Sequence, residues 1–544
     1  MCRTWAYRIT LLAVMGWMTG WGCGSADPKD AGFFCYNEST GIASLDPAFA
    51  KNQSIMWAVH QLYNTLVEVD SNLQIRPSLA HRWDISEDGT VYTFYLRTDV
   101  RFHDDPCFKE GSGRKLVAED VAFSLQRIMD PATASSGAWI FNGRVKKENG
   151  FIALNDSTLQ VRLEAPFPPI LGILSMQYCS VVPKEAIRQY GKNFRSHPVG
   201  TGPFQLVALE EGQALLLKKN PNYFEKDENG RQLPYINGIK ISFNDSKATE
   251  FLLFRQGKLH FINDIDASFK DEILTKKGEL RTEWKDKIQL NKHAYLNVEY
   301  LGILVDTSNL LVKQSPLRSR AIRQALNYGF DRKKMMLYLR NSIGRAAESG
   351  FVPAGLPSFD TAKVKGYQFN PVKAKELLAA AGFKDGKGLP EITLLTVPIY
   401  SELASYIVRE WQELGVPVKV DVVQKSLLLE QTAQSQALFF RGSWIADYPD
   451  AENYLSVFYG KNPAPPNYTR YRNPAYDKLY EQALTETNDR VRFELYQEMD
   501  RMILQDAPVI PLWYDEVIHL VQPFVQNFSP NALNLLELRR VRFN

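Results

Sequence analysis

One short segment of the chain combines the residue types that bind a charged ligand. From Arg441 to Asp450 it reads RGSWIADYPD, so the carboxylate of Asp447 lies among aromatic and aliphatic residues. Burying a carboxylate in such surroundings costs several kcal/mol unless a cation and hydrogen-bond donors replace the lost water. We therefore expect Asp447 to have a cationic partner, supplied either by the protein or by a ligand.

The geometry of this segment allows two interpretations. If it is extended, Arg441 and Asp447 share one face, roughly 20 Å apart at about 3.3 Å per residue. This separation is too long for a direct ion pair but suits two charges that hold the ends of a bound chain. Alternatively, Asp447 and Asp450 cap turns or the helix that follows. The local chemistry leaves both interpretations open.

Further short motifs occur in a fixed order along nearly the whole chain. They are Ser44-Leu-Asp-Pro47, Pro77–Ala80, Asp88–Phe94, Ala118–Val121, Pro198–Phe204, Asn220–Phe224, Arg320–Ala325 and Lys373–Leu378. Together with the segment above, they make the chain resemble the extracellular solute-binding proteins of peptide and nickel ABC importers, especially the oligopeptide-binding lipoproteins.

The resemblance implies a role for individual residues. In peptide-binding members, the aspartate at the position of Asp447 binds the α-ammonium of the ligand, and an arginine six residues earlier, here Arg441, reaches toward a ligand carboxylate. The backbone beside Trp444 pairs with an extended peptide, and a segment near the N-terminus lines the opposite side. The implied ligand-binding residues are Asp447, Arg441, Trp444, Ser443, Ile445, Gly41 and Ile42.

The resemblance also implies an α/β fold, the two-lobed periplasmic-binding-protein fold of the large cluster C type. An extra N-terminal subdomain packs on lobe I, and the ligand cleft lies between the lobes. The implied divisions are a signal peptide at 1–22, lobe I at 23–65, the extra subdomain at 66–184, lobe I again at 185–290, lobe II at 291–514 and a C-terminal return to lobe I at 515–544.

Local patterns agree with a mixed α/β chain. Asn370-Pro371 provides a cap and a first-turn proline for a helix over 373–381. Residues 402–414 form a second predicted helix, and alternating valines over 416–422 predict the strand after it. A third helix is expected over 489–504, before Pro508, and strands are expected over 91–96, 158–163, 214–219 and 239–243.

The N-terminus has the features of an export signal. Arg3 and Arg8 precede a short apolar stretch, Ile9–Met18, and the sequence Gly22-Cys23-Gly24 follows. This stretch is too short for a membrane span. We expect lipidation at Cys23 and a periplasmic or cell-surface location, with the membrane contacted only through the lipid; the alternative is ordinary signal cleavage. No later run of 18 apolar residues occurs.

Composition and cysteine usage narrow the function further. The net charge of +3 on 23% charged residues, without a basic block, disfavours nucleic acid as a partner. Of the five cysteines, Cys107 and Cys179 are the favoured disulfide pair once the signal and Cys23 are set aside. No Cys/His cluster, metalloprotease motif or nucleophile elbow occurs, so we expect no metal, no cofactor and no catalytic residues.

These observations predict a monomeric, lipid-anchored receptor that is not an enzyme. It would capture peptides by lobe closure and deliver them to ABC permease transmembrane subunits served by separate ATPase subunits. Three alternatives remain: the same fold with an oligosaccharide, metal chelate or haem as ligand; a lipoprotein hydrolase; and a surface receptor or scaffold without a transport role.

Overall fold

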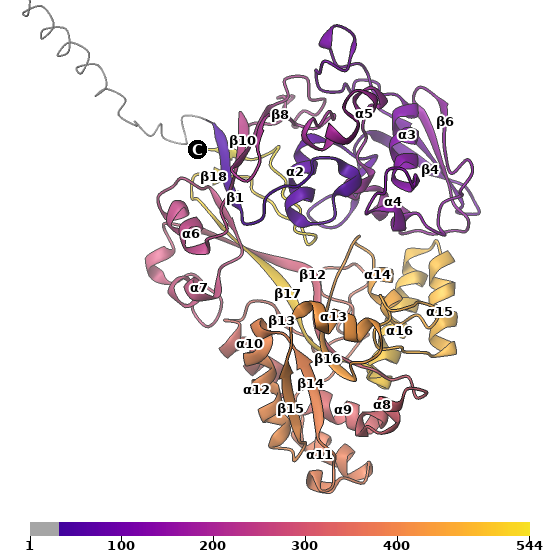
Figure 1. Cartoon of the computed structure of the whole chain (residues 1–544), viewed down its shortest axis with the longest axis vertical. Coiled ribbons are helices and arrows are strands. Elements are labelled where there is room, and N and C mark those ends of the chain that lie inside the picture. The colour runs from indigo at the N-terminus through magenta and orange to yellow at the C-terminus, as the bar shows by residue number, and fades with distance from the viewer. Residues whose placement is uncertain (1–31) are drawn as a thin grey trace, which may run out of the picture.

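The computed structural model describes residues 32–544, so the predicted signal peptide and Cys23 lie outside the described residues. Figure 1 shows two lobes, one above the other, joined by long strands. One 11-stranded sheet passes through both lobes in the order β15-β14-β16-β12-β17-β11-β1-β10-β9-β8, with β13 paired to β17. Its strands are β1 (Phe33–Glu38), β8 (Phe204–Glu210), β9 (Ala214–Lys219), β10 (Gly238–Phe243), β11 (Phe261–Asn263), β12 (Gln289–Ile303), β13 (Arg345–Ala346), β14 (Ile392–Thr396), β15 (Val418–Val422), β16 (Phe439–Ile445) and β17 (Val509–Val521).

The strands β12 and β17 connect the lobes as one antiparallel ribbon. In lobe I, β17 also pairs with β11, and in lobe II, β12 also pairs with β16. The register between them shifts twice, once between Ala294 and Val298 and once between Glu299 and Tyr300. Such irregularities bend a ribbon locally. The expected lobe boundaries at 290/291 and 514/515 fall within these two strands.

The upper lobe holds the extra subdomain on its right-hand side (Figure 1). A separate four-stranded antiparallel sheet, in the order β4-β5-β7-β6, forms this subdomain. Its elements are β4 (Ala80–Ile85), β5 (Val91–Leu96), α3 (Ala118–Met129), β6 (Phe151–Asn155), β7 (Thr158–Arg162) and α4 (Ile170–Leu174). The remaining elements of the upper lobe are α2 (Gln53–Leu62), β2 (Val67–Val69), β3 (Ile75–Pro77), α5 (Lys184–Tyr190), α6 (Lys247–Arg255), α7 (Ala267–Ile273), β18 (Val525–Gln526) and β19 (Arg542–Phe543).

Lobe II surrounds its half of the sheet with helices. They are α8 (Leu310–Lys313), α9 (Arg320–Tyr328), α10 (Arg332–Leu339), α11 (Pro371–Ala380), α12 (Ser401–Gln412), α13 (Lys425–Ala433), α14 (Glu452–Leu455), α15 (Pro474–Thr485) and α16 (Asp489–Asp506). The expected cap is present, because the Asn370 side chain accepts from the backbone N–H of Lys373 at the start of α11. Within 32–544, no helix has the length and apolar character that crossing a bilayer requires.

Each lobe buries a side chain in the core of the other. Tyr448 of lobe II is 1% exposed and belongs to the core cluster of lobe I. Leu73, from the turn between β2 and β3, is 6% exposed and belongs to a core cluster of lobe II. Gly172 of α4 also closely approaches Tyr448 and Pro449. The lobes are therefore also in contact outside the ribbon that joins them.

The C-terminal segment returns to lobe I and packs on α2. The indole Nε1 of Trp57 donates to the carbonyl of Asn534 at 2.6 Å, and the amide of Gln61 donates to the carbonyl of Leu536 at 2.7 Å. Leu538 and Val541 are fully buried in the same core as Trp57. The first and last segments of the described chain thus form one packing unit.

The disulfide predicted between Cys107 and Cys179 is wrong, because both residues are free thiols in the structure. Cys179 is buried in the core, where its thiol donates to the carbonyl of Ile173 at 3.3 Å. Cys107 instead belongs to the loop held by Asp105, whose carboxylate accepts from the Cys107 backbone N–H at 2.8 Å. Each cysteine is therefore fixed by its own local contacts.

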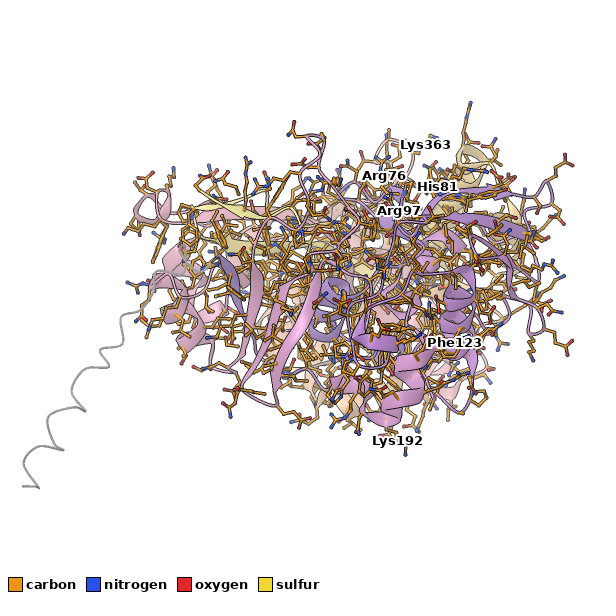
Figure 2. All side chains as sticks on the ribbon, turned by 90° about the horizontal axis from the view of Figure 1, so that it is seen from above. Arg76, His81, Arg97, Phe123, Lys192 and Lys363 are labelled. Atoms are coloured by element: carbon orange, nitrogen blue, oxygen red, sulfur yellow. The ribbon has the colours of Figure 1, made fainter. Side chains whose placement is uncertain are left out.

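Two arginines on the surface of the upper lobe form ion pairs with nearby aspartates. Figure 2 labels both, Arg76 and Arg97, together with His81. Arg76 forms an ion pair with Asp70 at 2.8 Å, and Arg97 forms one with Asp99 at 2.7 Å. Both arginines therefore already have acidic partners within the protein.

Candidate functional site

A cavity of about 680 Å³ lies between the two lobes. The upper wall comes from α2 and the segment that follows it, and from the C-terminal segment 533–535. The extra subdomain supplies a second wall, and lobe II supplies Ile445, the last residue of β16, and the three residues that follow it. The size is within the range of small-ligand sites, and the position between two lobes is a common one for them.

Asp447 presents its carboxylate to this cavity. The side chain is exposed toward the cavity, yet the surrounding protein desolvates it and raises its pKa above the usual value. Asn453 donates to Asp447 Oδ2 at 3.2 Å, which lowers the pKa in part. Arg144, from the extra subdomain, lowers it further through its charge. No lysine or arginine of the described chain forms an ion pair with Asp447, so the expected cationic partner is not a direct contact within the protein.

Asn453 fixes the loop that carries Asp447. Its side-chain oxygen accepts from Trp444 Nε1 at 2.9 Å and from the backbone N–H of Asp447 at 3.4 Å. The sequence left open whether Asp447 and Asp450 both cap turns. Only Asp450 makes such a bond: it accepts from the backbone N–H of Glu452 at 2.9 Å, and it lies 3.8 Å from Arg492. Asp447 has no such capping bond in the described structure and remains available to a ligand.

The strand β16, which leads to Asp447, is paired on only one side over most of its length. It pairs with β12 from Phe439 to Ile445. On its other side, the only strand partner among the described residues is β14, at the single pair Leu395 and Phe440. The backbone beyond Phe440, including Ser443, therefore leaves one edge free, and this edge ends at the half-exposed Ile445 on the cavity wall.

Arg441 lies outside the cavity lining and has a protein partner. Its guanidinium forms an ion pair with Glu299 and lies 3.8 Å from the centre of the Tyr400 ring. Its side chain is 14% exposed and that of Glu299 is 4% exposed. Burial raises the pKa of Glu299, and the Arg441 charge opposes that rise. A ligand carboxylate at this position would have to share Arg441 with Glu299.

The other predicted site residues are spread around the cavity. Asp447 and Ile445 line it, whereas Ser443 and Trp444 belong to the strand that leads to it. Gly41 is exposed, and Ile42 is buried in the core of lobe I; neither lines the cavity. The structure therefore brings together the segment from 443 to 447 but separates it from the predicted N-terminal contact.

Much of the cavity wall was not predicted from the sequence. The unpredicted residues include Met56, Trp57, His60, Tyr63, Glu68, Trp139, Met176, Tyr178, Tyr295 and Leu535. Those on α2 are spaced at helical intervals that equally describe a core-facing helix, and Trp139 lies in a segment without a recognisable pattern. Glu68 is paired with Arg539 at 2.7 Å and His60 with Glu537 at 3.3 Å, which leaves Asp447 as the acidic group without an ion pair in this wall.

The lining of the cavity has the side chains that a ligand site needs. No group of three or more His, Cys, Asp or Glu side chains between residues 32 and 544 is arranged to hold a metal ion. The cavity is lined by apolar and aromatic side chains and by polar ones in similar number, so it can offer a ligand both apolar surface and hydrogen-bonding groups.

Two lobes joined by paired strands around an inter-lobe cavity define a two-lobed periplasmic binding protein, as the sequence predicted. Comparison with known proteins gives the family: the chain belongs to the bacterial extracellular solute-binding proteins, family 5, whose middle-region model matches residues 74–466.

Individual relatives match nearly the whole chain. Haem-binding protein A of Haemophilus influenzae is 27% identical, with 91% of this chain and 89% of the relative covered. The dipeptide-binding protein DppE of Bacillus subtilis is 25% identical, with 92% and 90% covered. The solved structure of HbpA2 from Haemophilus parasuis superposes with a TM-score of 0.81 at 24% identity, covering 94% of this chain and all of that one. This last likeness supports the fold.

Proposed function

We propose that this protein captures peptides through their free α-ammonium group and delivers them to an ABC importer. The observation that carries the proposal is the carboxylate of Asp447, which faces the inter-lobe cavity without an ion-pair partner in the described chain. A partly desolvated carboxylate with a raised pKa gains most from a ligand that supplies a positive charge and N–H donors. An α-ammonium group supplies both.

The free edge of β16 supports a peptide over other amines. An extended ligand can add to an unpaired strand edge through main-chain hydrogen bonds, which depend little on side-chain identity. The backbone from Ser443 to Ile445 would supply these bonds, with Trp444 held by Asn453. The ligand then runs from Asp447 back along β16, toward Arg441.

Two further contacts are part of the proposal. Arg441 binds a carboxylate at the far end of short peptides, in competition with Glu299, and the segment at Gly41 and Ile42 lines the opposite side of the cleft for longer ligands. Closure about the β12–β17 ribbon buries the peptide, since the closed-state contacts are strongest when the ligand bridges both lobes.

The cellular role follows from the family and the N-terminal sequence. We propose a monomeric receptor that does no chemistry, is anchored in the periplasm or at the cell surface by a lipid on Cys23, and docks on permease transmembrane subunits driven by separate ATPase subunits. Neither nucleic acid nor a cofactor has a part in this mechanism.

Titration calorimetry of the purified protein tests the proposal with a matched pair of ligands. Tetra-alanine should bind, and N-acetyl-tetra-alanine, which lacks the ammonium group, should bind at least about tenfold more weakly. Equal affinities would rule out anchoring through the ammonium group. Hemin is the comparison ligand: tight binding of hemin without any peptide binding would transfer the function to a non-peptide ligand.

A further inference from the structure

The wall of the cavity beside Asp447 comes from the extra subdomain and has a chemistry of its own. Its lining residues are Trp139, Gly172, Met176 and Tyr178, together with the uncharged polar residues Ser136, Ser175, Gln177 and Ser180. Trp139 lies in a short 3₁₀ segment, Ala138–Ile140, and is 40% exposed, although most large apolar side chains of this subdomain are buried. Met176 and the nearly buried Tyr178 continue the same surface.

Electrostatics place this wall close to the anchoring carboxylate. The charge of Asp447 contributes to the raised pKa of Tyr178, although burial is the larger cause. Tyr178 and Ser136 approach within 3.4 Å through their hydroxyl groups, so a polar atom of the wall is already engaged. The lining residues of the wall carry no acidic or basic side chain. It offers the apolar and aromatic surface of Trp139 and Met176 beside uncharged polar groups, and none of its lining side chains can form an ion pair with a charged side chain.

We propose that this wall is the subsite for the side chain of the ligand's first residue and that it selects a large apolar or aromatic one. The inference rests on the proposed function, because an ammonium group at Asp447 fixes where the rest of the ligand lies. The α-ammonium nitrogen and the first side chain are bonded to the same Cα atom. The first side chain must therefore lie near Asp447, in the cavity that Trp139 and Met176 also line.

The physical reason for the selection is the exposed indole. A half-exposed tryptophan in a cavity gains from covering its apolar surface, and aromatic rings add a favourable contact beyond simple burial. A glycine or alanine at the first position leaves Trp139 uncovered, and a charged side chain loses water without gaining a partner. Trp139 is thus the specificity-determining residue of the subsite.

The test compares two tripeptides, Phe-Ala-Ala and Gly-Ala-Ala, by titration calorimetry on the wild type and on Trp139→Ala. The wild type should prefer the phenylalanine peptide by at least about tenfold. Trp139→Ala should reduce that ratio to below about threefold while it leaves the affinity for Gly-Ala-Ala within about twofold. Trp139→Phe should keep most of the preference.

Ile85→Ala is the matched control, because Ile85 is an apolar side chain of the same subdomain that is 48% exposed and does not line the cavity. It should change neither affinity, and the melting temperatures of all variants show whether they fold. The subsite is overturned if the wild type has no preference, or if Trp139→Ala weakens both peptides equally. Peptides that bind equally well after N-acetylation, or that do not bind at all, overturn the proposed function and this subsite with it.

Discussion

Replacing Asp447 by asparagine tests the anchor most directly, because the amide keeps the shape of the side chain and removes its charge. Hydrogen bonds to charged groups contribute about 1.5–3 kcal/mol, so we expect the dissociation constant for a free peptide to rise about 10- to 150-fold. The charge of Arg144 already compensates part of the carboxylate charge. For this reason we do not expect the loss to exceed that range.

The same substitution should act on the ligand-free protein in the opposite direction. The pKa of Asp447 is raised in the fold, so the folded state holds the proton more tightly than the unfolded chain. The ionised carboxyl therefore destabilises the fold above its unfolded pKa of 3.8, and the penalty grows as the pH rises through the folded pKa. At pH 7, Asp447→Asn should be at least as stable as the wild type without ligand, and this gain should disappear below pH 3.8.

Calorimetry with tetra-alanine and urea unfolding at several pH values measure both effects. Asp421→Asn is the control, because Asp421 is an exposed residue of lobe II that does not line the cavity. Wild-type affinity should also fall as the pH is lowered through the raised pKa, and the affinity of the variant should not. A variant that binds within about twofold of the wild type, or that is less stable without ligand, would refute the reasoning.

Three more substitutions test other parts of the structure. Arg441→Ala leaves Glu299 buried without its cation and should lower the free energy of unfolding by about 3–5 kcal/mol. In urea unfolding, adding Glu299→Gln should restore most of this stability. Arg441→Ala should weaken the binding of short peptides more than that of long ones, and an equal loss at all lengths would make Arg441 structural. Gly172→Leu should hold the lobes apart and weaken peptide binding by about 1–3 kcal/mol. In small-angle scattering, this variant should lose the compaction that the ligand induces. Gly172→Ala, whose Cβ would make only ordinary contacts, should keep both the binding and the compaction. Burial lowers the pKa of His293 to about 4 and that of His519 to about 3, so the contribution of each histidine to stability should fall from pH 6.5 toward pH 4, by up to about 1.4 kcal/mol per pH unit. Buried carboxyl groups with a raised pKa, such as Asp500, act in the opposite direction over this range, so the test compares the wild type with His519→Asn by urea unfolding at each pH. The stability of the wild type relative to His519→Asn should fall with the pH, and a difference that does not change with pH would contradict this assignment.

The fold was accessible from the sequence because its signals are local and repeated. The alternating valines before Val422 and the Asn370-Pro371 cap each determine one element, and the structure has the expected strand β15 and helix α11 at these places. The strands predicted over 91–96 and 214–219 match β5 and β9 residue for residue. Backbone propensity and capping act over a few residues, so a single sequence is enough to reveal them.

The cavity could be predicted only in part from the sequence, because its walls come from segments that are far apart in the chain. The desolvated setting of Asp447 could be read from its neighbours in the chain, but its distance from Arg144 and the ion pair of Arg441 with Glu299 depend on contacts between distant segments. The predicted disulfide was wrong for the same reason. The compartment and the cysteine count permitted a bond, but in the fold Cys179 packs against the carbonyl of Ile173 and remains a free thiol.

The return of the C-terminus to α2 constrains how the protein acquires its fold. The hydrogen bonds from Trp57 and Gln61 close loops of 477 and 475 residues, which ranks them among the most distant contacts a chain of this length can make. Closing long loops is slow and must precede the contacts that stabilise them. During synthesis, the part of α2 that the C-terminal segment covers therefore stays exposed until the last residues emerge. Lobe I is complete only when the whole chain is available.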